Sequence, residues 1–173
     1  MRVVGVDPGL SRCGVGVVDG PGHRPRAVRA GVIRTPAGDP TARRLALLHA
    51  ELTAVLADTR PDAVAVERVF VNANTRTAMG VGQAAGVVLL CAEQARLQVT
   101  EYTPTQVKAT VTGSGTADKA QVGFMVRALL GLAEIPRPAD AADALALAIC
   151  HLQASGERAA LAPPAGGDRG GLR

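Results

Sequence analysis

Four acidic residues occupy positions from which their carboxylates can converge. Asp7 and Glu67 each end a short apolar segment that is typical of a buried strand. If these segments are parallel neighbours in one sheet, both acids lie at the same edge, where open α/β sheets bind their ligands. Asp140 and Asp143 are three residues apart at the start of a predicted helix, so their side chains share one helix face.

Such a group of carboxylates is suited to binding metal ions. Converging carboxylates repel one another at neutral pH, and divalent cations remove that repulsion. Hard oxygen ligands favour Mg²⁺ or Mn²⁺ over zinc. Two such ions about 3.5–4 Å apart cleave phosphodiesters, one ion activating water and the other stabilising the leaving oxygen. The four acids therefore predict a metal-dependent site for phosphodiester cleavage.

Each acid also has a purely structural interpretation. Asp7 precedes Pro8-Gly9 and could initiate a turn. Asp140 could be a helix cap, and Asp143 a favourable charge in the first helical turn. Glu67 is harder to explain in this way, because it directly follows Ala-Val-Ala-Val in a segment that is typical of a buried strand. The combination of all four favours the metal site.

The fold that would position these acids follows from the order of the predicted elements. Residues 3–7, 13–19 and 27–34 are predicted strands joined by short turns, so they run antiparallel. Residues 62–67 and 98–102 are predicted strands that follow helices, so they run parallel to the first. Helices are expected from Asp39-Pro40, over 75–96, from Thr103-Pro104, from a cap at Thr116, and from Asp140 to about Gln153. The pattern predicts an α/β fold with a five-stranded mixed sheet and helices on both faces.

Length and composition bound the remaining possibilities. The 173 residues (17.6 kDa) are expected to form one domain over residues 1–154 and a disordered Gly- and Pro-rich tail over 155–173. No apolar run approaches the ~20 residues that cross a bilayer, and Asp7 and Pro8 interrupt the N-terminus too early for a signal peptide. We therefore expect a soluble, cytoplasmic protein without membrane association. Three widely spaced cysteines predict neither a disulfide framework nor a zinc site.

The charge balance indicates a polyanionic partner. The formal net charge is +4, and lysine occurs only at Lys108 and Lys119 among 19 basic residues. A compact ammonium is useful as a point charge beside a phosphate. Two phenylalanines, one tyrosine and no tryptophan are too few for a single-strand binder built on stacked aromatic side chains.

Five segments carry a more specific signal. They are Val-Asp-Pro-Gly-Leu-Ser-Arg-Cys-Gly (6–14), Ala-Val-Glu-Arg-Val-Phe (65–70), Gln-Val-Lys (106–108), Gly-Ser-Gly-Thr-Ala-Asp-Lys-Ala-Gln-Val (113–122) and Ala-Asp-Ala-Ala-Asp-Ala-Leu-Ala-Leu-Ala (139–148). In order and spacing they resemble the RuvC family of bacterial Holliday-junction resolvases, over residues 1 to about 153. The resemblance implies a ribonuclease-H-like fold and a homodimer that nicks four-way DNA junctions in homologous recombination and repair.

The resemblance also implies roles for the acids. Asp7, Glu67, Asp140 and Asp143 match the family's metal-site residues, with two Mg²⁺ ions expected per site and Mn²⁺ as a substitute. Some relatives carry histidine at the third position, whereas Asp140 makes this site entirely carboxylate. Paired, symmetric hydrolysis would leave 5′-phosphate and 3′-hydroxyl ends.

Further residues match the family's DNA contacts. Lys108 and Lys119 match basic residues beside the site, where they would bind the scissile strand and offset transition-state charge. Phe70 matches an aromatic residue that probes bases at the crossover, although it could instead be a core residue under its loop. Asn74 and Arg76 make that loop polar and are expected to contact DNA as well.

The expected partners are four-way junction DNA, a second copy of the chain and, by resemblance, the RuvA–RuvB branch-migration complex. Residues 75–92 match the family's dimer helix, and their many glycines and alanines allow two backbones to approach closely. The alternative for this helix is packing only on its own sheet. A two-fold junction also requires two sites related by the same axis.

Two other functions fit parts of the pattern. Actin-like proteins and sugar kinases also begin with a strand, an aspartate and a glycine turn, but they clamp ATP between two such domains and this chain has one. A DNA-binding module without catalysis is the other alternative. The complete set of four acids favours an enzyme.

Overall fold

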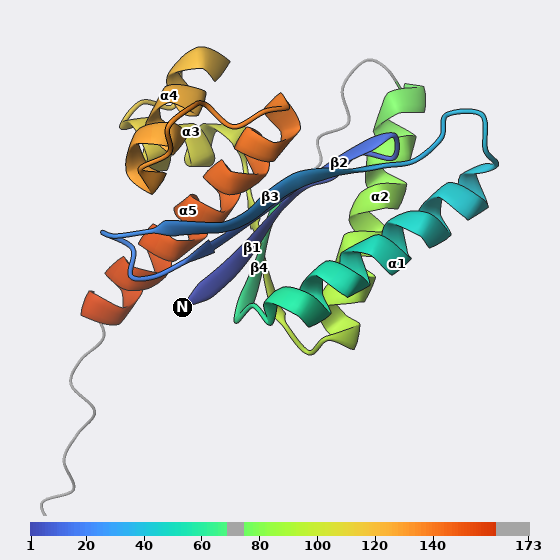
Figure 1. Cartoon of the computed structure of the whole chain (residues 1–173), viewed down its shortest axis with the longest axis horizontal. Helices are drawn as coiled ribbons and strands as arrows, with labels where there is room; N and C mark the ends of the chain where they lie inside the picture. The colour runs from blue at the N-terminus through green and yellow to red at the C-terminus, as the bar shows by residue number, and fades with distance from the viewer. Residues whose placement is uncertain (69–74, 162–173) are drawn as a thin grey trace, which may run out of the picture.

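A mixed five-stranded sheet forms the centre of the molecule (Figure 1). The computed structural model describes the backbone of residues 1–68 and 75–161 and the side chains of residues 1–68 and 78–156. Its elements are β1 (Arg2–Asp7), β2 (Arg12–Asp19), β3 (Arg26–Arg34), α1 (Thr41–Thr59), β4 (Ala63–Glu67), α2 (Thr75–Gln94), β5 (Gln98–Tyr102), α3 (Pro104–Thr112), α4 (Lys119–Leu130) and α5 (Ala139–Leu161). The strands lie in the order β3-β2-β1-β4-β5.

The strand directions confirm the predicted topology. β1, β2 and β3 form an antiparallel meander, while β4 pairs parallel with β1 and β5 pairs parallel with β4. β1 is therefore the central strand, and it joins the meander to the parallel half of the sheet.

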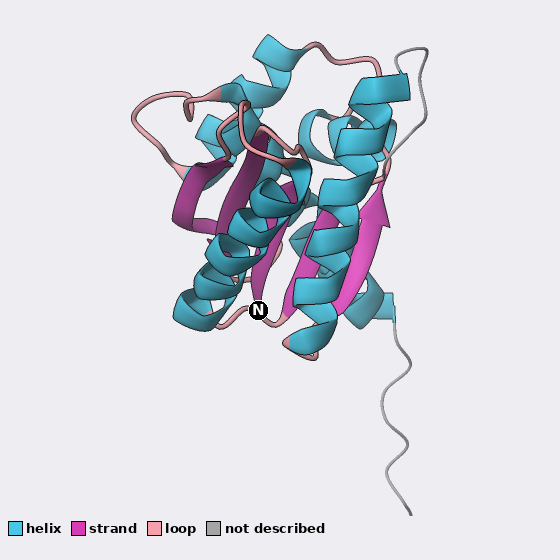
Figure 2. Cartoon of the chain, turned by 90° about the vertical axis from the view of Figure 1, so that its right-hand side faces the viewer, coloured by secondary structure: helices cyan, strands magenta, loops and turns pink. Residues whose placement is uncertain are grey.

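Helices cover both faces of the sheet, as expected. α1 and α2 lie on one face, and α3, α4 and α5 lie on the other (Figures 1 and 2). Alternate residues of β1 point to opposite faces: Val4 packs in one buried cluster with Leu48 and Val88, and Val3 packs in the other with Leu145. Burial on both sides explains why this strand is apolar without alternation.

Glycines allow α5 to lie directly on β1 and β2. A β-carbon on Gly5 would come within 2.0 Å of the Ala144 carbonyl oxygen, and one on Gly16 within 2.6 Å of the Leu145 nitrogen. No side chain fits at such a distance, so the strand and helix backbones are in contact there. The glycines therefore fix how closely the helix that carries Asp140 and Asp143 approaches the sheet.

The start of α1 differs from the sequence-based expectation. The helix begins at Thr41 and its N-cap is Pro40, which makes no side-chain cap. The extended conformation of Pro40 (φ −55°, ψ 141°) separates Asp39 from the helix. The prediction that Asp39 caps this helix is therefore wrong.

The next two helix starts give one confirmation and one correction. Thr103 caps α3 in a capping box with Gln106, as the Thr-Pro signal predicts. α4 is capped by Asp118 in a capping box with Gln121, so the predicted cap at Thr116 is wrong. The reciprocal pair of hydrogen bonds with Gln121 is available only to a residue three positions before it.

The last helix is longer than expected. α5 continues to Leu161, past the predicted end near Gln153, because Glu157 and the residues after it favour helix. The boundary expected at residue 154 lies inside this helix, and residues 162–173 of the expected tail lie outside the described residues. Among the helices that the structure describes, none is long and apolar enough to cross a membrane.

Candidate active site

Asp7 and Glu67 lie next to each other at one edge of the sheet. Val6 pairs with Val66 in the parallel β1–β4 ladder, and the two acids directly follow this pair. Each acid therefore stands at the carboxyl end of its strand, partly buried. The strand register places the pair as the sequence predicts.

The start of α5 reaches the same edge through β2. Gly14 pairs with Asp7 in the antiparallel β1–β2 ladder. A β-carbon on Gly14 would lie 2.1 Å from the Asp140 carbonyl oxygen and 3.2 Å from the Asp140 β-carbon. Asp140 thus sits directly over the residue that pairs with Asp7. Because α5 begins at Ala139, Asp140 lies in its first turn and is not its cap.

The four acids act on one another electrostatically. Burial, and then the negative charges of Glu67, Asp143 and Asp140, raise the pKa of Asp7 to about 7. Burial, and then the charge of Asp143, raise the pKa of Glu67. Lys119 opposes both shifts in part. A carboxyl group with a pKa near neutrality marks a place where an added positive charge is stabilised.

Two basic side chains already neutralise the acids of α5. Arg12 donates to Asp140 through Nε at 3.0 Å and through a second bond from Nη2. Lys119 Nζ donates to Asp143 Oδ2 at 3.1 Å. Burial works to raise the pKa of Asp140, but its bond with Arg12 and further favourable contacts leave that pKa below its ordinary value. The hydrogen bond to Asp143 raises the pKa of Lys119.

The donor chemistry of the site fits hard divalent cations. It consists of carboxylate oxygens, and burial together with the charges of neighbouring acids raises the pKa of Asp7. Within the described part of the chain, no three acid, histidine or cysteine side chains are yet gathered closely enough to hold an ion. Asp140 and Asp143 are instead engaged in ion pairs with Arg12 and Lys119. An ion bound by all four acids would replace these two basic partners.

The other predicted site residues differ in whether they contact the acids and in whether their side chains are described. Lys119, at the first position of α4, contacts the acids, with its side chain 79% exposed. Lys108 lies on α3, and no ion pair joins it to these acids in the described residues. Phe70 and Asn74 lie outside the described residues. Arg76 belongs to the first turn of α2, where only the backbone is described.

Sequence reasoning gave no role to Arg12. In an antiparallel hairpin, the residues just before Gly14 lie beyond the end of β1, at the same edge as Asp7. A basic residue at this position of the hairpin is therefore expected to lie near Asp7, and this is how Arg12 could have been predicted. Arg44 was missed too, and it hydrogen-bonds the same turn through Ser11.

α2 exposes an apolar face away from the sheet. Met79 is 66% exposed and Leu90 is 50% exposed, and Leu89 is exposed as well. Between them, β-carbons on Gly82 and Gly86 would meet no atom within 4 Å among the described residues. Large apolar side chains therefore flank a strip of the helix on which another backbone can lie closely.

A mixed sheet of this order, with helices on both faces, defines the class of ribonuclease-H-like folds, and the acids at the ends of β1 and β4 fit its metal-dependent nucleases. Comparisons with known proteins narrow the class. The family model described as "Crossover junction endodeoxyribonuclease RuvC" matches residues 3–151. The chain therefore belongs to the RuvC family, as the sequence motifs predict.

Individual relatives agree with this assignment. The RuvC of Frankia alni is 65% identical over 153 residues, which cover 88% of this chain and 78% of that protein. The RuvC of Salinispora arenicola is 57% identical over 166 residues, 95% of each chain. A solved structure of Thermus thermophilus RuvC in complex with a Holliday junction substrate is similar with a TM-score of 0.87 and 41% identity, covering 91% of this chain and 96% of that one. These matches confirm the expected fold.

Proposed function

We propose that this protein is a crossover-junction endodeoxyribonuclease that resolves four-way DNA junctions in homologous recombination and repair. Family membership supports the substrate and the reaction. The observation that carries the mechanism is geometric: Asp7 and Glu67 end neighbouring parallel strands, and Asp140 lies over Gly14, the residue that pairs with Asp7. The alternative of a kinase fragment has no support in a chain whose family model spans nearly all of it.

The acids would hold two Mg²⁺ ions, with Mn²⁺ as a substitute. Asp7 and Glu67 would bind them from the sheet edge, and Asp140 and Asp143 from α5. When bound, the ions would supply the charge that activates water and stabilises the leaving oxygen. With the 3′ oxygen as the leaving group, cleavage would leave 5′-phosphate and 3′-hydroxyl ends. The rigid attachment of α5 to β1 and β2 keeps the two pairs of acids at a fixed separation.

Basic residues would position the DNA strand. Lys119, once released from Asp143, presents an exposed ammonium to the scissile phosphate and stabilises the charge that develops on it. Lys108 is proposed to bind the strand further along, on α3. Phe70, Asn74 and Arg76 follow Glu67 in the chain, and we propose that they contact bases and backbone near the crossover.

The exposed face of α2 supports a homodimer. A two-fold junction presents two equivalent strands, so paired nicks require two sites related by one axis. Met79, Leu89 and Leu90 would supply the apolar contact between two copies of α2. Association with a RuvA–RuvB complex, action in the cytoplasm and a nuclease domain spanning residues 1–154 are parts of the same proposal, and membership of the bacterial RuvC family supports them.

The experiment that tests this function compares a synthetic four-way junction with a linear duplex of the same sequence. We expect nicks on the junction only, in Mg²⁺ and not in EDTA. Tight junction binding without nicks, in either metal and with several core sequences, would instead indicate a binding module whose acids are idle.

A further inference from the structure

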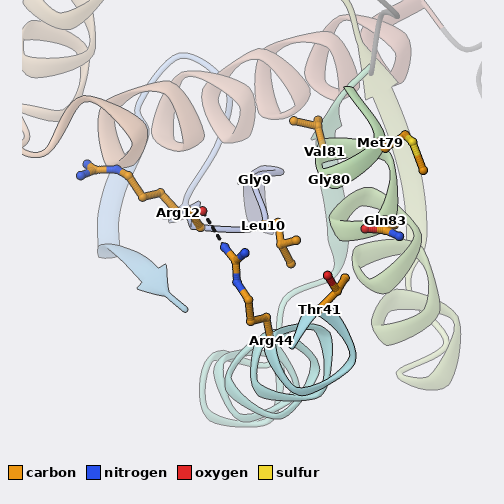
Figure 3. Close-up of a pocket in the computed structure, with 10 residues that line it drawn as sticks. Gly9, Leu10, Arg12, Thr41, Arg44, Met79, Gly80, Val81 and Gln83 are labelled. Carbon is orange, nitrogen blue, oxygen red and sulfur yellow. Dashed lines mark hydrogen bonds between the residues drawn. The ribbon is translucent and has the colours of Figure 1, made fainter. Parts of the chain in front are cut away.

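A cavity of about 930 Å³ lies behind the active-site turn, on the side away from α5 (Figure 3). Three elements form it: the turn from Gly9 to Arg12, the start of α1, and the first half of α2. The turn directly follows Asp7, so it forms the partition between the acids and the cavity. The cavity therefore begins two residues along the chain from Asp7.

Arg44 is the main charged group of this cavity. Its guanidinium extends from α1 toward the turn (Figure 3), where Nη2 donates to Ser11 Oγ at 2.6 Å and Nε donates to Thr35 Oγ1 at 2.9 Å. Both partners are neutral hydroxyls, and no carboxylate in the described residues is ion-paired with Arg44. A guanidinium has five N–H donors, so donors remain for a further acceptor.

The charge of Arg44 is thus held in place without being neutralised. Arg12, on the other side of the same turn, points toward α5 and is paired with Asp140. Two hydrogen bonds already hold this guanidinium in place, so little side-chain freedom would be lost when it binds a phosphate. Gln83 lines the same cavity and adds an amide, and Thr41 forms part of its wall.

We propose that this cavity is a second phosphate subsite, in which Arg44 binds a backbone phosphate of the DNA strand away from the scissile bond. The inference rests on the proposed function, since it takes the strand held at the acids as the ligand. The metal-loaded acids would hold the scissile phosphate on one side of the turn, and Arg44 would hold another phosphate of the same strand on the other side. The subsite would therefore fix the register of the strand over the metal site.

Two variants test this subsite, each with a matched control. Arg44→Gln removes the charge, with Arg24→Gln as control because Arg24 is exposed at the opposite end of the sheet. Thr41→Glu adds a carboxylate to the cavity wall, three residues before Arg44 on the same helix face, where it neutralises the guanidinium, with Thr41→Gln as control. A glutamate in the first turn of α1, which has no acidic residue there, favours the helix. Thr41→Glu should thus weaken binding without lowering the unfolding midpoint.

The measurement is the affinity for a labelled four-way junction in EDTA over a series of salt concentrations. We expect Arg44→Gln and Thr41→Glu to weaken binding about tenfold near 0.1 M salt, the range of one charge-assisted contact. Arg44→Gln should also reduce the slope of log K against log salt by about 0.7–0.9, the change for one lost phosphate contact. The control variants should match the wild type in both quantities.

The outcomes separate the subsite from the proposed function. If the wild-type protein does not prefer the junction over a linear duplex, the proposed function fails. If it does, and both variants bind with wild-type affinity and slope, the subsite is overturned. The subsite is also overturned if the variants dimerise less well but bind the junction with wild-type affinity at protein concentrations high enough to restore the dimer. The cavity would then hold a second copy of the chain. Free dTMP as competitor should displace the junction only weakly, which distinguishes a strand site from a nucleotide site.

Discussion

Gly14 lies so close beneath Asp140 that a β-carbon on it would come within 2.1 Å of the Asp140 carbonyl oxygen. Gly14 is also the residue that pairs with Asp7 across the β1–β2 ladder. One glycine therefore sets the separation between an acid of the sheet and an acid of α5. The spacing of the metal site depends on this backbone contact as well as on the acids themselves.

Gly14→Ala should move the start of α5 away from the sheet. Overpacking of this kind costs about 1–3 kcal/mol of unfolding free energy, and we expect the cleavage rate to fall by more than the loss of folded protein explains. The check is chemical denaturation beside single-turnover cleavage. Gly31→Ala in β3 is the control, because its β-carbon meets no described atom within 4 Å. Equal cleavage by both variants would show that the contact does not set the site.

Asp7 should make stability depend on pH in the metal-free protein. Burial and neighbouring acids raise its pKa from 3.8 to about 7, so between these values the folded state binds more protons than the unfolded state. The contribution of Asp7 to stability is thus fully present below pH 3.8 and is lost as the pH rises through 7. We expect Asp7→Asn to be more stable than the wild type at pH 8, by of the order of 2–4 kcal/mol, and equal to it near pH 4.

Urea unfolding in EDTA across this pH range measures the difference directly. A constant difference between the two proteins at every pH would contradict the raised pKa. Adding Mg²⁺ should reduce the advantage of Asp7→Asn at pH 8, because bound cations remove the repulsion that the amide removes.

Lys119→Ala should slow cleavage more than it weakens binding. If its ammonium stabilises charge that develops at the phosphate, its loss costs about 100-fold or more in rate, with a smaller loss of junction affinity. Lys119→Arg keeps the charge and should restore binding more fully than rate. Single-turnover cleavage and equilibrium binding separate the two effects, and an unchanged rate for Lys119→Ala would exclude the phosphate contact.

Leu90→Glu should prevent dimerisation without unfolding the protein. Leu90 is 50% exposed on α2, so the change costs little in one copy but places a charge in the proposed interface. Sedimentation should show a monomer, and junction cleavage should change from paired nicks to single ones. Val28→Glu on β3, at 46% exposure, is the control for an added surface charge. A dimer that survives Leu90→Glu would place the interface elsewhere.

The sequence was informative wherever a pattern is local or repeated along the chain. Strand 3–7 and the acid that ends it follow from a run of apolar residues, and the order of strands and helices is enough to predict the mixed sheet. The Thr-Pro signal located the start of α3 for the same reason. The five motif segments, in their order and spacing, indicated the family, and the family model confirms it.

Features that depend on competition between neighbouring residues were harder to predict. Thr116 and Asp118 are both good caps, and only the reciprocal bond with Gln121 decides between them. The ion pair between Arg12 and Asp140 joins residues 128 positions apart, so it requires the hairpin register and the position of α5. The role of Gly14 could not be predicted from the sequence, because it depends on how closely the α5 backbone lies against the strand at this residue.

The central claim is that the acids at the end of β1, at the end of β4 and on α5 cleave junction DNA with bound metal. The most direct test measures nicking and binding of a mobile four-way junction by Asp7→Asn beside the wild type, in Mg²⁺, with the nicks mapped on both strands. We predict paired symmetric nicks for the wild type, and for Asp7→Asn no nicks at wild-type junction affinity. Nicking by Asp7→Asn at the wild-type rate would contradict the claim, as would a loss of folding and binding together.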